Sequence, residues 1–154
     1  KKFENYSSFS EANVKQIYGE GLEKGLKYEA TMFQSVILLN EGGKFKINIL
    51  PNLAQFSTIQ AIVSEDFNLD GYKDLLIGGN LFNAEIETTR ADASVGLLFL
   101  GNKNNLISRA LGPQESGFFI PYDVKDIKSI KVNGKPSVLV GINNNAALFF
   151  RNLK

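Results

Sequence analysis

The sequence contains no cysteine, no histidine and no tryptophan among its 154 residues. Without thiols or imidazoles, the chain can form no disulfide, has no cysteine or histidine-activated nucleophile, and lacks the ligands of typical structural zinc sites. The absence of cysteine does not fix the compartment, because cytosolic and secreted chains can both lack it. The absence of tryptophan also removes the side chain that is favoured for stacking on sugar rings.

The sequence also lacks an excess of charge of one sign and any long apolar run. It has 17 Lys and Arg against 16 Asp and Glu, a net charge of +1, so no basic field is present to hold a nucleic acid or an anionic membrane. The longest apolar runs are about four to six residues, too short to span a bilayer. Because the chain begins at Lys1 without a Met or a signal peptide, we expect a processed form or an excised part of a longer protein.

The chain changes character near residue 32. In the segment 1–32, Ser8 and Glu11 have the spacing of a capping box, a helical pattern runs over 11–19, and Gly19 is a plausible end. A second, weaker helical pattern covers 20–30. From 33 to 154, nine short β-rich segments are separated by Gly, Asn and Pro; they are 35–40, 44–50, 58–64, 73–79, 94–101, 106–111, 127–132, 136–142 and 147–152. We therefore predict a mainly β, antiparallel fold with a short N-terminal helical segment.

These strand segments repeat with a period of about 60 residues. VILLNEGGKF at 36–45 matches GLLFLGNKNNL at 96–106, and DGYKDLLIG at 70–78 matches NGKPSVLVG at 133–141. Four strands in about 60 residues are typical of a β-propeller blade with one long loop. The segment 33–154 is then a partial propeller of about two to three blades.

The sequence DFNLDGYKD at 66–74 indicates a bound cation. Asp66, Asn68, Asp70 and Asp74 stand at relative positions 1, 3, 5 and 9, and Tyr72 at position 7 can offer its backbone carbonyl. Alternate residues of such a turn point inward, and hard oxygen ligands in a flexible shell suit Ca²⁺. The loop is not an EF-hand, because position 12 is an apolar Ile instead of a bidentate Glu and both flanks are strands. The alternative is a solvated turn in which Asp and Asn only bend the backbone, although such a turn explains two of these residues more easily than all four.

The second copy of this segment has lost its acidic residues. With an offset of 63 residues (133 − 70), the four side-chain positions fall on Ser129, Lys131, Asn133 and Ser137, while Gly134 keeps the turn. We therefore predict one metal site, in the first copy only.

The pattern D-x-N-x-D-G-x-x-D-L-x-x-G resembles the FG-GAP/VCBS repeat, the calcium-loop motif of propeller blades. Other segments, among them LLNEGGKF, LPNLAQFS, DLLIGGNLFN, RADASVGLLFLG and ESGFFIPYDVKDI, resemble the C-terminal part of secreted, cartilage-acidic-protein-like VCBS proteins, over roughly 27–151. The resemblance implies a seven- or eight-bladed parent propeller that is secreted, periplasmic or on the cell surface and that binds or adheres without known catalysis. It assigns calcium-ligand roles to Asp66, Asn68, Asp70, Tyr72 and Asp74.

The segment NLFNAEIETTRADA at 80–93 is long for a connection between two strands, and such loops are often functional. Glu85, Glu87, Arg90 and Asp92 are candidates for contact with a ligand or a partner. In the alternative interpretation, Arg90 pairs with a nearby acid and pins the loop.

The leading hypothesis is a calcium-binding extracellular module for binding or adhesion, without catalytic activity, whose partner is a protein or polysaccharide at the cell surface. The alternative is a secreted carbohydrate-active enzyme or its polysaccharide-binding accessory domain, with two carboxylates as acid and base. A partial propeller also leaves strand edges open, so we expect a longer polypeptide, self-association through those edges, or the N-terminal helices covering one of them.

Overall fold

The computed structural model describes residues 2–103, 107 and 109–151. The chain divides into two compact units, residues 1–33 and 34–154. In the part of the chain that is described, no helix is long and apolar enough to cross a membrane.

Over residues 2–33, the first unit has three short helices, α1 (Tyr6–Ser10), α2 (Val14–Tyr18) and α3 (Gly21–Lys24). The predicted Ser8–Glu11 capping box is wrong. Ser8 is instead the third helical residue of α1, where it completes a capping box with Asn5, and Asn13 and Gln16 form the equivalent box of α2. Asn caps as well as Ser because its side-chain oxygen reaches the same backbone N–H groups. Gly19 ends α2 with φ of 58°, as the sequence predicted.

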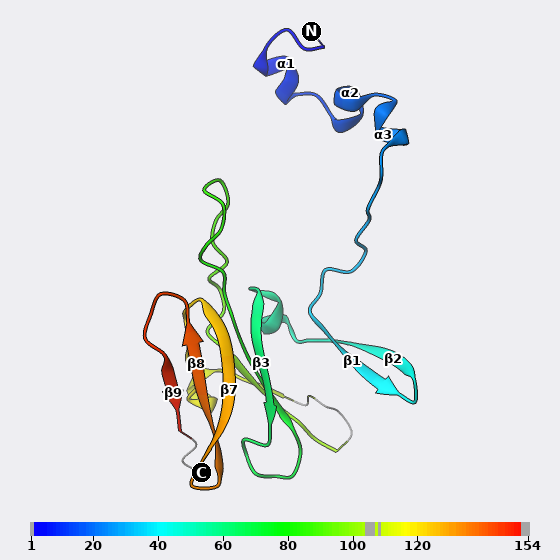
Figure 1. The fold of residues 1–154 in the computed structure, drawn as a ribbon. Helices are drawn as coiled ribbons and strands as arrows, with labels where there is room; N and C mark the ends of the chain where they lie inside the picture. Colours follow the sequence, from blue (N-terminus) through cyan, green and yellow to red (C-terminus); the bar gives the residue numbers. More distant parts are fainter. Residues whose placement is uncertain (1, 104–106, 108, 152–154) are drawn as a thin grey trace. The chain divides into compact units, whose positions relative to one another are not determined.

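The described residues of the second unit form three antiparallel sheets, which confirms the mainly β prediction (Figure 1). A ribbon pairs β1 (Val36–Glu41) with β2 (Lys44–Ile49). A four-stranded sheet has the order β3 (Ile59–Glu65), β4 (Asp74–Gly79), β5 (Leu97–Leu100) and β6 (Arg109–Leu111). A three-stranded sheet has the order β7 (Val124–Val132), β8 (Lys135–Ile142) and β9 (Leu148–Phe150). A 3-10 helix, η1 (Asn52–Gln55), follows β2, and α4 (Pro113–Ser116) follows β6.

The two central strands of the four-stranded sheet, β4 and β5, are covered on both faces and are apolar at consecutive positions, whereas β3 alternates and leaves Ile62 exposed. On β4, Leu76 faces a core shared with β7 and β8, whereas Ile77 faces a second core shared with β1 and η1. The first core contains Val124, Ile127, Val138 and Val140; the second contains Leu50, Ala54, Leu97 and Phe99. The four-stranded sheet therefore packs on the three-stranded sheet, while the ribbon reaches the second core through Ile37.

The two hairpins that the predicted repeat aligns differ in their turns. β7 and β8 are joined by the two-residue turn Asn133-Gly134, and both residues have positive φ (52° and 77°), the combination that a type I′ turn requires. β3 and β4 are joined instead by residues 66–73, which carry the acidic stretch. The additional residues of the first copy therefore lie in the loop predicted to bind a cation.

Candidate metal site and its surroundings

The acidic loop closes the β3–β4 hairpin just beyond the pair formed by Glu65 and Asp74. Two of its residues have positive φ, Leu69 (61°) and Gly71 (91°). Glycine adopts this conformation freely, but for leucine it costs about 1–2 kcal/mol. The hydrogen bonds of the neighbouring side chains offset this cost.

Asp66 folds the loop back on itself. Its Oδ1 accepts a hydrogen bond from the backbone N–H of Asp70 at 3.0 Å, and its Oδ2 accepts one from Gly71 at 2.8 Å. These bonds hold the chain in the sharp turn that Gly71 permits. The carboxylate retains acceptor capacity, because two oxygens offer about four lone-pair directions.

Asn68 and Asp70 lie at the exposed end of the loop. Asn68 Oδ1 accepts from the Asp70 N–H at 3.1 Å, and Asn68 Nδ2 donates to Asp70 Oδ2 at 2.8 Å. Asp70 Oδ1 accepts from the N–H of Tyr72 at 2.9 Å. These two N–H donors thus stabilise the Asp70 carboxylate by hydrogen bonding in the structure.

Asp74 has a different environment, because its side chain is completely buried. Its Oδ2 accepts from the N–H of Phe67 at 2.9 Å and of Asn68 at 3.4 Å, and its Oδ1 accepts from Gly101 at 2.9 Å. The last bond reaches from β4 to the end of β5. Asp74 therefore ties the acidic loop to the four-stranded sheet through three backbone donors.

The side chains of all four predicted ligands thus accept hydrogen bonds from the backbone of the loop without an ion; they are Asp66, Asn68, Asp70 and Asp74. A turn without a cation therefore accounts for all four residues, and not only for two of them. Among the described residues, no three acidic side chains are grouped closely enough to form a metal site. The donor set still suits a hard cation, because Asp66, Asn68 and Asp70 offer oxygens on the accessible part of the loop and each carboxylate has unused acceptor capacity.

In the second copy, Ser137 occupies the buried position that Asp74 has in the first. Lys131 and Ser129 lie within β7, paired with Pro136 and Val138, and Asn133 is in the turn. These residues form a continuous hairpin, so the second copy has no loop around which oxygens could gather.

The 80–93 segment extends away from the sheets as a narrow hairpin (Figure 1). Leu81 and Ala91 exchange two backbone hydrogen bonds at its base. Arg90 Nε donates to Asp92 Oδ2 at 2.8 Å, and its guanidinium lies 4.7 Å from the centre of the Phe82 ring. Glu85 and Glu87 are exposed near the tip. Arg90 and Asp92 therefore pair with each other, whereas the two glutamates remain accessible.

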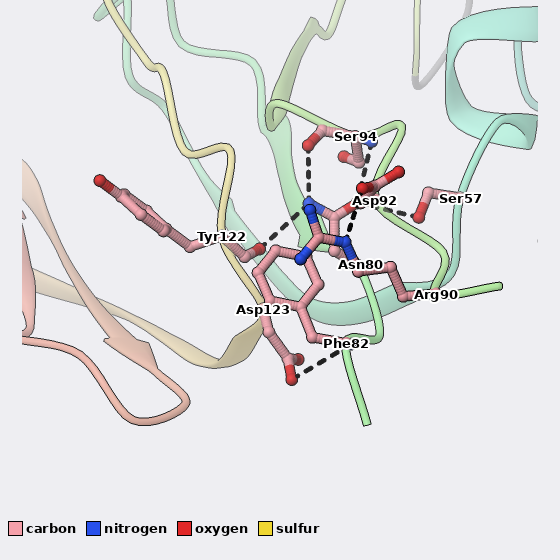
Figure 2. Close-up of polar contacts among 8 residues, drawn as sticks. All are labelled: Ser57, Asn80, Phe82, Arg90, Asp92, Ser94, Tyr122 and Asp123. Carbon is pink, nitrogen blue, oxygen red and sulfur yellow. Dashed lines mark hydrogen bonds and ion pairs between the residues drawn. The ribbon is translucent and has the colours of Figure 1, made fainter. Parts of the chain in front are cut away.

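Figure 2 shows a buried polar cluster at the base of this hairpin, which the sequence did not predict. Asn80 is completely buried and has φ of 76°. Its Oδ1 accepts from Ser57 Oγ and the N–H of Ser94, and its Nδ2 donates to the carbonyls of Ser94 and Tyr122. Asn80 therefore joins the start of the hairpin to two other segments. An Asn directly after IGG at a strand end is a recognisable signal for left-handed backbone.

Asp123 is the other buried member of this region. Its Oδ1 lies 2.8 Å from Lys125 Nζ, and its Oδ2 accepts from the N–H of Phe82 at 3.5 Å and from Asn143 Nδ2 at 3.2 Å. Burial raises the pKa of Asp123, but the Lys125 ammonium and the two N–H donors lower it more, so its pKa lies below the ordinary 3.8. The cluster is arranged to hold the hairpin in place.

A cleft of about 650 Å³ lies between the four-stranded and three-stranded sheets. Its described walls are mainly apolar, with Leu76, Leu98, Phe118 and Val138 among them, and Glu115 is the acidic residue that lines it. Glu115 pairs with Arg109. Hydrolysis of a glycoside requires two carboxylates on either side of the bond, and the described walls of this cleft do not supply that pair.

Comparison of the chain with known proteins finds no matching family model, no matching curated protein and no matching solved structure.

Proposed function

We propose that this chain is part of a calcium-stabilised β-propeller that acts as a non-catalytic, extracellular module for binding or adhesion. The observation that carries the proposal is the spacing of side-chain oxygens in the acidic loop, which joins the neighbouring strands β3 and β4.

The sheet order supports the propeller. A blade is a four-stranded antiparallel sheet whose strands follow chain order, and β3–β6 has that topology. By the sequence repeat, β1–β2 corresponds to the last two strands of a preceding blade and β7–β9 to the first three of a following blade. The packing of the four-stranded sheet on the three-stranded sheet agrees with this assignment.

The ion would bind at the accessible part of the acidic loop. Asp66, Asn68, Asp70 and the carbonyl of Tyr72 would hold it, and Asp74 would anchor the loop through its bonds to the N–H groups of Phe67 and Asn68. Ca²⁺ would supply the positive charge that draws these oxygens together, so its role is structural. Extracellular modules bind Ca²⁺ with a Kd of about 10⁻⁴–10⁻³ M, which suits a secreted, periplasmic or cell-surface protein.

The partner surface we propose is the tip of the 80–93 hairpin. Glu85 and Glu87 are exposed there, while the buried cluster of Asn80 and Asp123 fixes the base. A rigid base with accessible side chains at the tip is the usual design of a binding loop on a β scaffold. The partner is a protein or polysaccharide at the cell surface.

Titration calorimetry with Ca²⁺ on the whole chain tests the metal site. We expect one ion per chain for the wild type and at least a tenfold weaker affinity for Asp70→Ala. Asp92→Ala is the matched control, since it removes an exposed Asp outside the acidic loop, and it should bind like the wild type. No heat of binding at millimolar Ca²⁺, or equal affinity for Asp70→Ala, would refute the site.

A further inference from the structure

Two dipeptides in the sequence place a glycine directly after Asp or Asn, namely Asp70-Gly71 and Asn133-Gly134. Each lies between the two strands of a hairpin, the first in the β3–β4 loop and the second in the β7–β8 turn. The backbone nitrogen of the glycine can attack the side-chain Cγ of the residue before it, because a glycine has no Cβ to obstruct the approach. Ring closure gives a succinimide, so both dipeptides are candidate sites of spontaneous modification.

The hydrogen bonds of the acidic loop protect Asp70-Gly71. The attacking group would be the N–H of Gly71, and it donates to Asp66 Oδ2 at 2.8 Å. Asp70 Oδ2 accepts from Asn68 Nδ2 at 2.8 Å, and Asp70 Oδ1 accepts from the N–H of Tyr72 at 2.9 Å. Because both reacting groups are held in other bonds, ring closure at Asp70 requires several of these hydrogen bonds to break.

Asn133-Gly134 is not restrained in this way. Both residues are exposed, and neither the Asn133 side chain nor the Gly134 N–H has a hydrogen-bond partner among the described residues. A Cβ added at Gly134 would meet no atom of a non-adjacent residue within 4 Å, so the ring has room to form. Lys131 and Lys135 flank the turn in the sequence, and their positive charge favours the loss of the Gly134 amide proton that the attack requires.

The geometry of the turn sets the rate of ring closure. Asn133 and Gly134 have the positive φ values of a type I′ turn, in which ψ of the first central residue is about 30°. This ψ turns the nitrogen of Gly134 away from the Cβ of Asn133, so the turn must open before the nitrogen can reach Cγ. The turn lies at the exposed end of the hairpin, beyond the pair Val132–Lys135, where local opening costs least. The folded chain should therefore react more slowly than an unstructured peptide, but without global unfolding.

We propose that Asn133 is a site of spontaneous deamidation. The nitrogen of Gly134 forms a bond to Cγ of Asn133, the Cγ–Nδ2 bond breaks, and the Nδ2 group leaves as ammonia with the proton that Gly134 loses. Water then opens one of the two carbonyl groups of the succinimide and leaves either aspartate or isoaspartate at this position. Aspartate keeps the turn, because Asp-Gly also suits type I′, whereas isoaspartate lengthens the turn by one backbone methylene and disturbs the pair Val132–Lys135. The inference does not rest on the proposed function, since neither a propeller nor an ion enters it.

Incubation of the folded chain at mildly alkaline pH, followed by digestion and peptide mass spectrometry, tests this. We expect the peptide that contains Asn133 to gain the mass difference between Asn and Asp, in two forms that electron-transfer fragmentation identifies as aspartate and isoaspartate. The rate at Asn133 should exceed the rate at every other described Asn by roughly tenfold or more, because only Asn133 precedes a glycine. Gly134→Asn is the matched variant, since Asn tolerates a positive φ but adds a Cβ, and the rate at Asn133 should fall by roughly tenfold or more. Circular dichroism confirms that this variant is folded.

A second variant tests the contrast with the acidic loop. Asp66→Ala removes the acceptor of the Gly71 N–H, so isoaspartate should then form at Asp70, while the rate at Asn133 stays as in the wild type. No isoaspartate at Asp70 in this variant would overturn the protective role of the loop. An Asn133 that stays unmodified until urea unfolds the chain, or that reacts no faster than Asn68, would overturn the proposal itself.

Discussion

Asp66, Asn68, Asp70 and Asp74 look alike in the sequence, but Asp74 differs in the structure because it alone is completely buried. In the interior, a carboxylate can accept hydrogen bonds from three backbone N–H groups through its two oxygens. An amide side chain would turn its NH₂ group toward at least one of these donors, so a hydrogen bond would be lost. The position of Asp74 at the first residue of a buried strand was visible in the sequence. Its bond to Gly101 was not, because that contact depends on how β5 pairs with β4.

Asp74→Asn should destabilise the protein by about 3 kcal/mol in chelator, because the new amide turns donors toward at least one of the N–H groups of Phe67, Asn68 and Gly101. Urea unfolding measures the change. Asp70→Asn is the matched control, and its exposed site should lose no more than about 0.5 kcal/mol under the same conditions. Equal losses in the two variants would show that the buried hydrogen bonds are not what stabilises the loop.

Asp123 should make stability depend on pH in the acid range. Its folded pKa lies below the value in the unfolded chain, so its contribution is present above the unfolded pKa and is lost as the pH falls through the folded pKa. We expect the melting temperature to fall below about pH 4, with a smaller fall for Asp123→Asn. Asp126→Asn, at an exposed position of β7, is the control for the loss of one carboxylate charge. A pH profile unchanged in Asp123→Asn would contradict this assignment.

At the scale of the elements, the strands were predictable and the helix boundaries were not. Each of the nine predicted β segments overlaps one of β1–β9, although 106, 108 and 152 lie outside the described residues. Alternating apolar residues between Gly, Asn and Pro carry that signal locally. Among the helices, Ser8 was predicted as the N-cap, but the N-cap of α1 is Asn5. The second helical pattern was predicted over 20–30, but α3 ends at Lys24, with Gly25 as its C-cap. Short helices depend on caps and contacts more than on pattern, so the sequence alone chose the wrong cap.

The two glycines at the end of β4 should respond differently to substitution. A Cβ on Gly78 would lie 2.8 Å from Ile127 Cδ1, the end of a flexible side chain, whereas one on Gly79 would lie 1.8 Å from the backbone oxygen of Thr58. We expect Gly78→Ala to cost about 1–3 kcal/mol and Gly79→Ala more than that, because a side chain can move aside and a paired backbone cannot.

A second substitution separates these two causes. Ile127→Val removes Cδ1, so it should recover part of the loss in Gly78→Ala and none of it in Gly79→Ala. Double-mutant cycles from urea unfolding provide the measurement. If Ile127→Val recovered neither or both, the packing of β4 against β7 would not be the reason for Gly78.

At the scale of the whole molecule, the sequence repeat predicted strands that recur every 60 or so residues, and the structure adds how the sheets cover one another. The predicted offsets of 61 and 63 residues would align Val36 with Leu97 and Asp74 with Ser137, and all four residues lie in strands. Which face each strand presents is decided by long-range packing, as at Leu76 and Ile77, and apolar residues at consecutive positions do not reveal it. For the same reason the sequence missed the cluster of Asn80 and Asp123, which joins segments far apart in the chain.

Calcium binding, if it occurs at the acidic loop, must stabilise the entire unit, because the loop is bonded to β4 and β5 through Asp74. An ion bound only by the folded chain with a Kd of about 10⁻⁴–10⁻³ M adds about 1.4–2.7 kcal/mol at about 10 mM free Ca²⁺. For a chain of this size that corresponds to a rise in melting temperature of about 3–10 °C. Scanning calorimetry in Ca²⁺ and in chelator measures the rise, and Mg²⁺ at the same concentration controls for ionic strength and should give a smaller one.

Asp70→Ala should abolish the rise while melting close to the wild type in chelator. Asp74→Asn should melt lower in both, since its loss comes from the buried hydrogen bonds; a wild type whose melting temperature ignores calcium would leave hydrogen bonding as the sole role of the acidic loop.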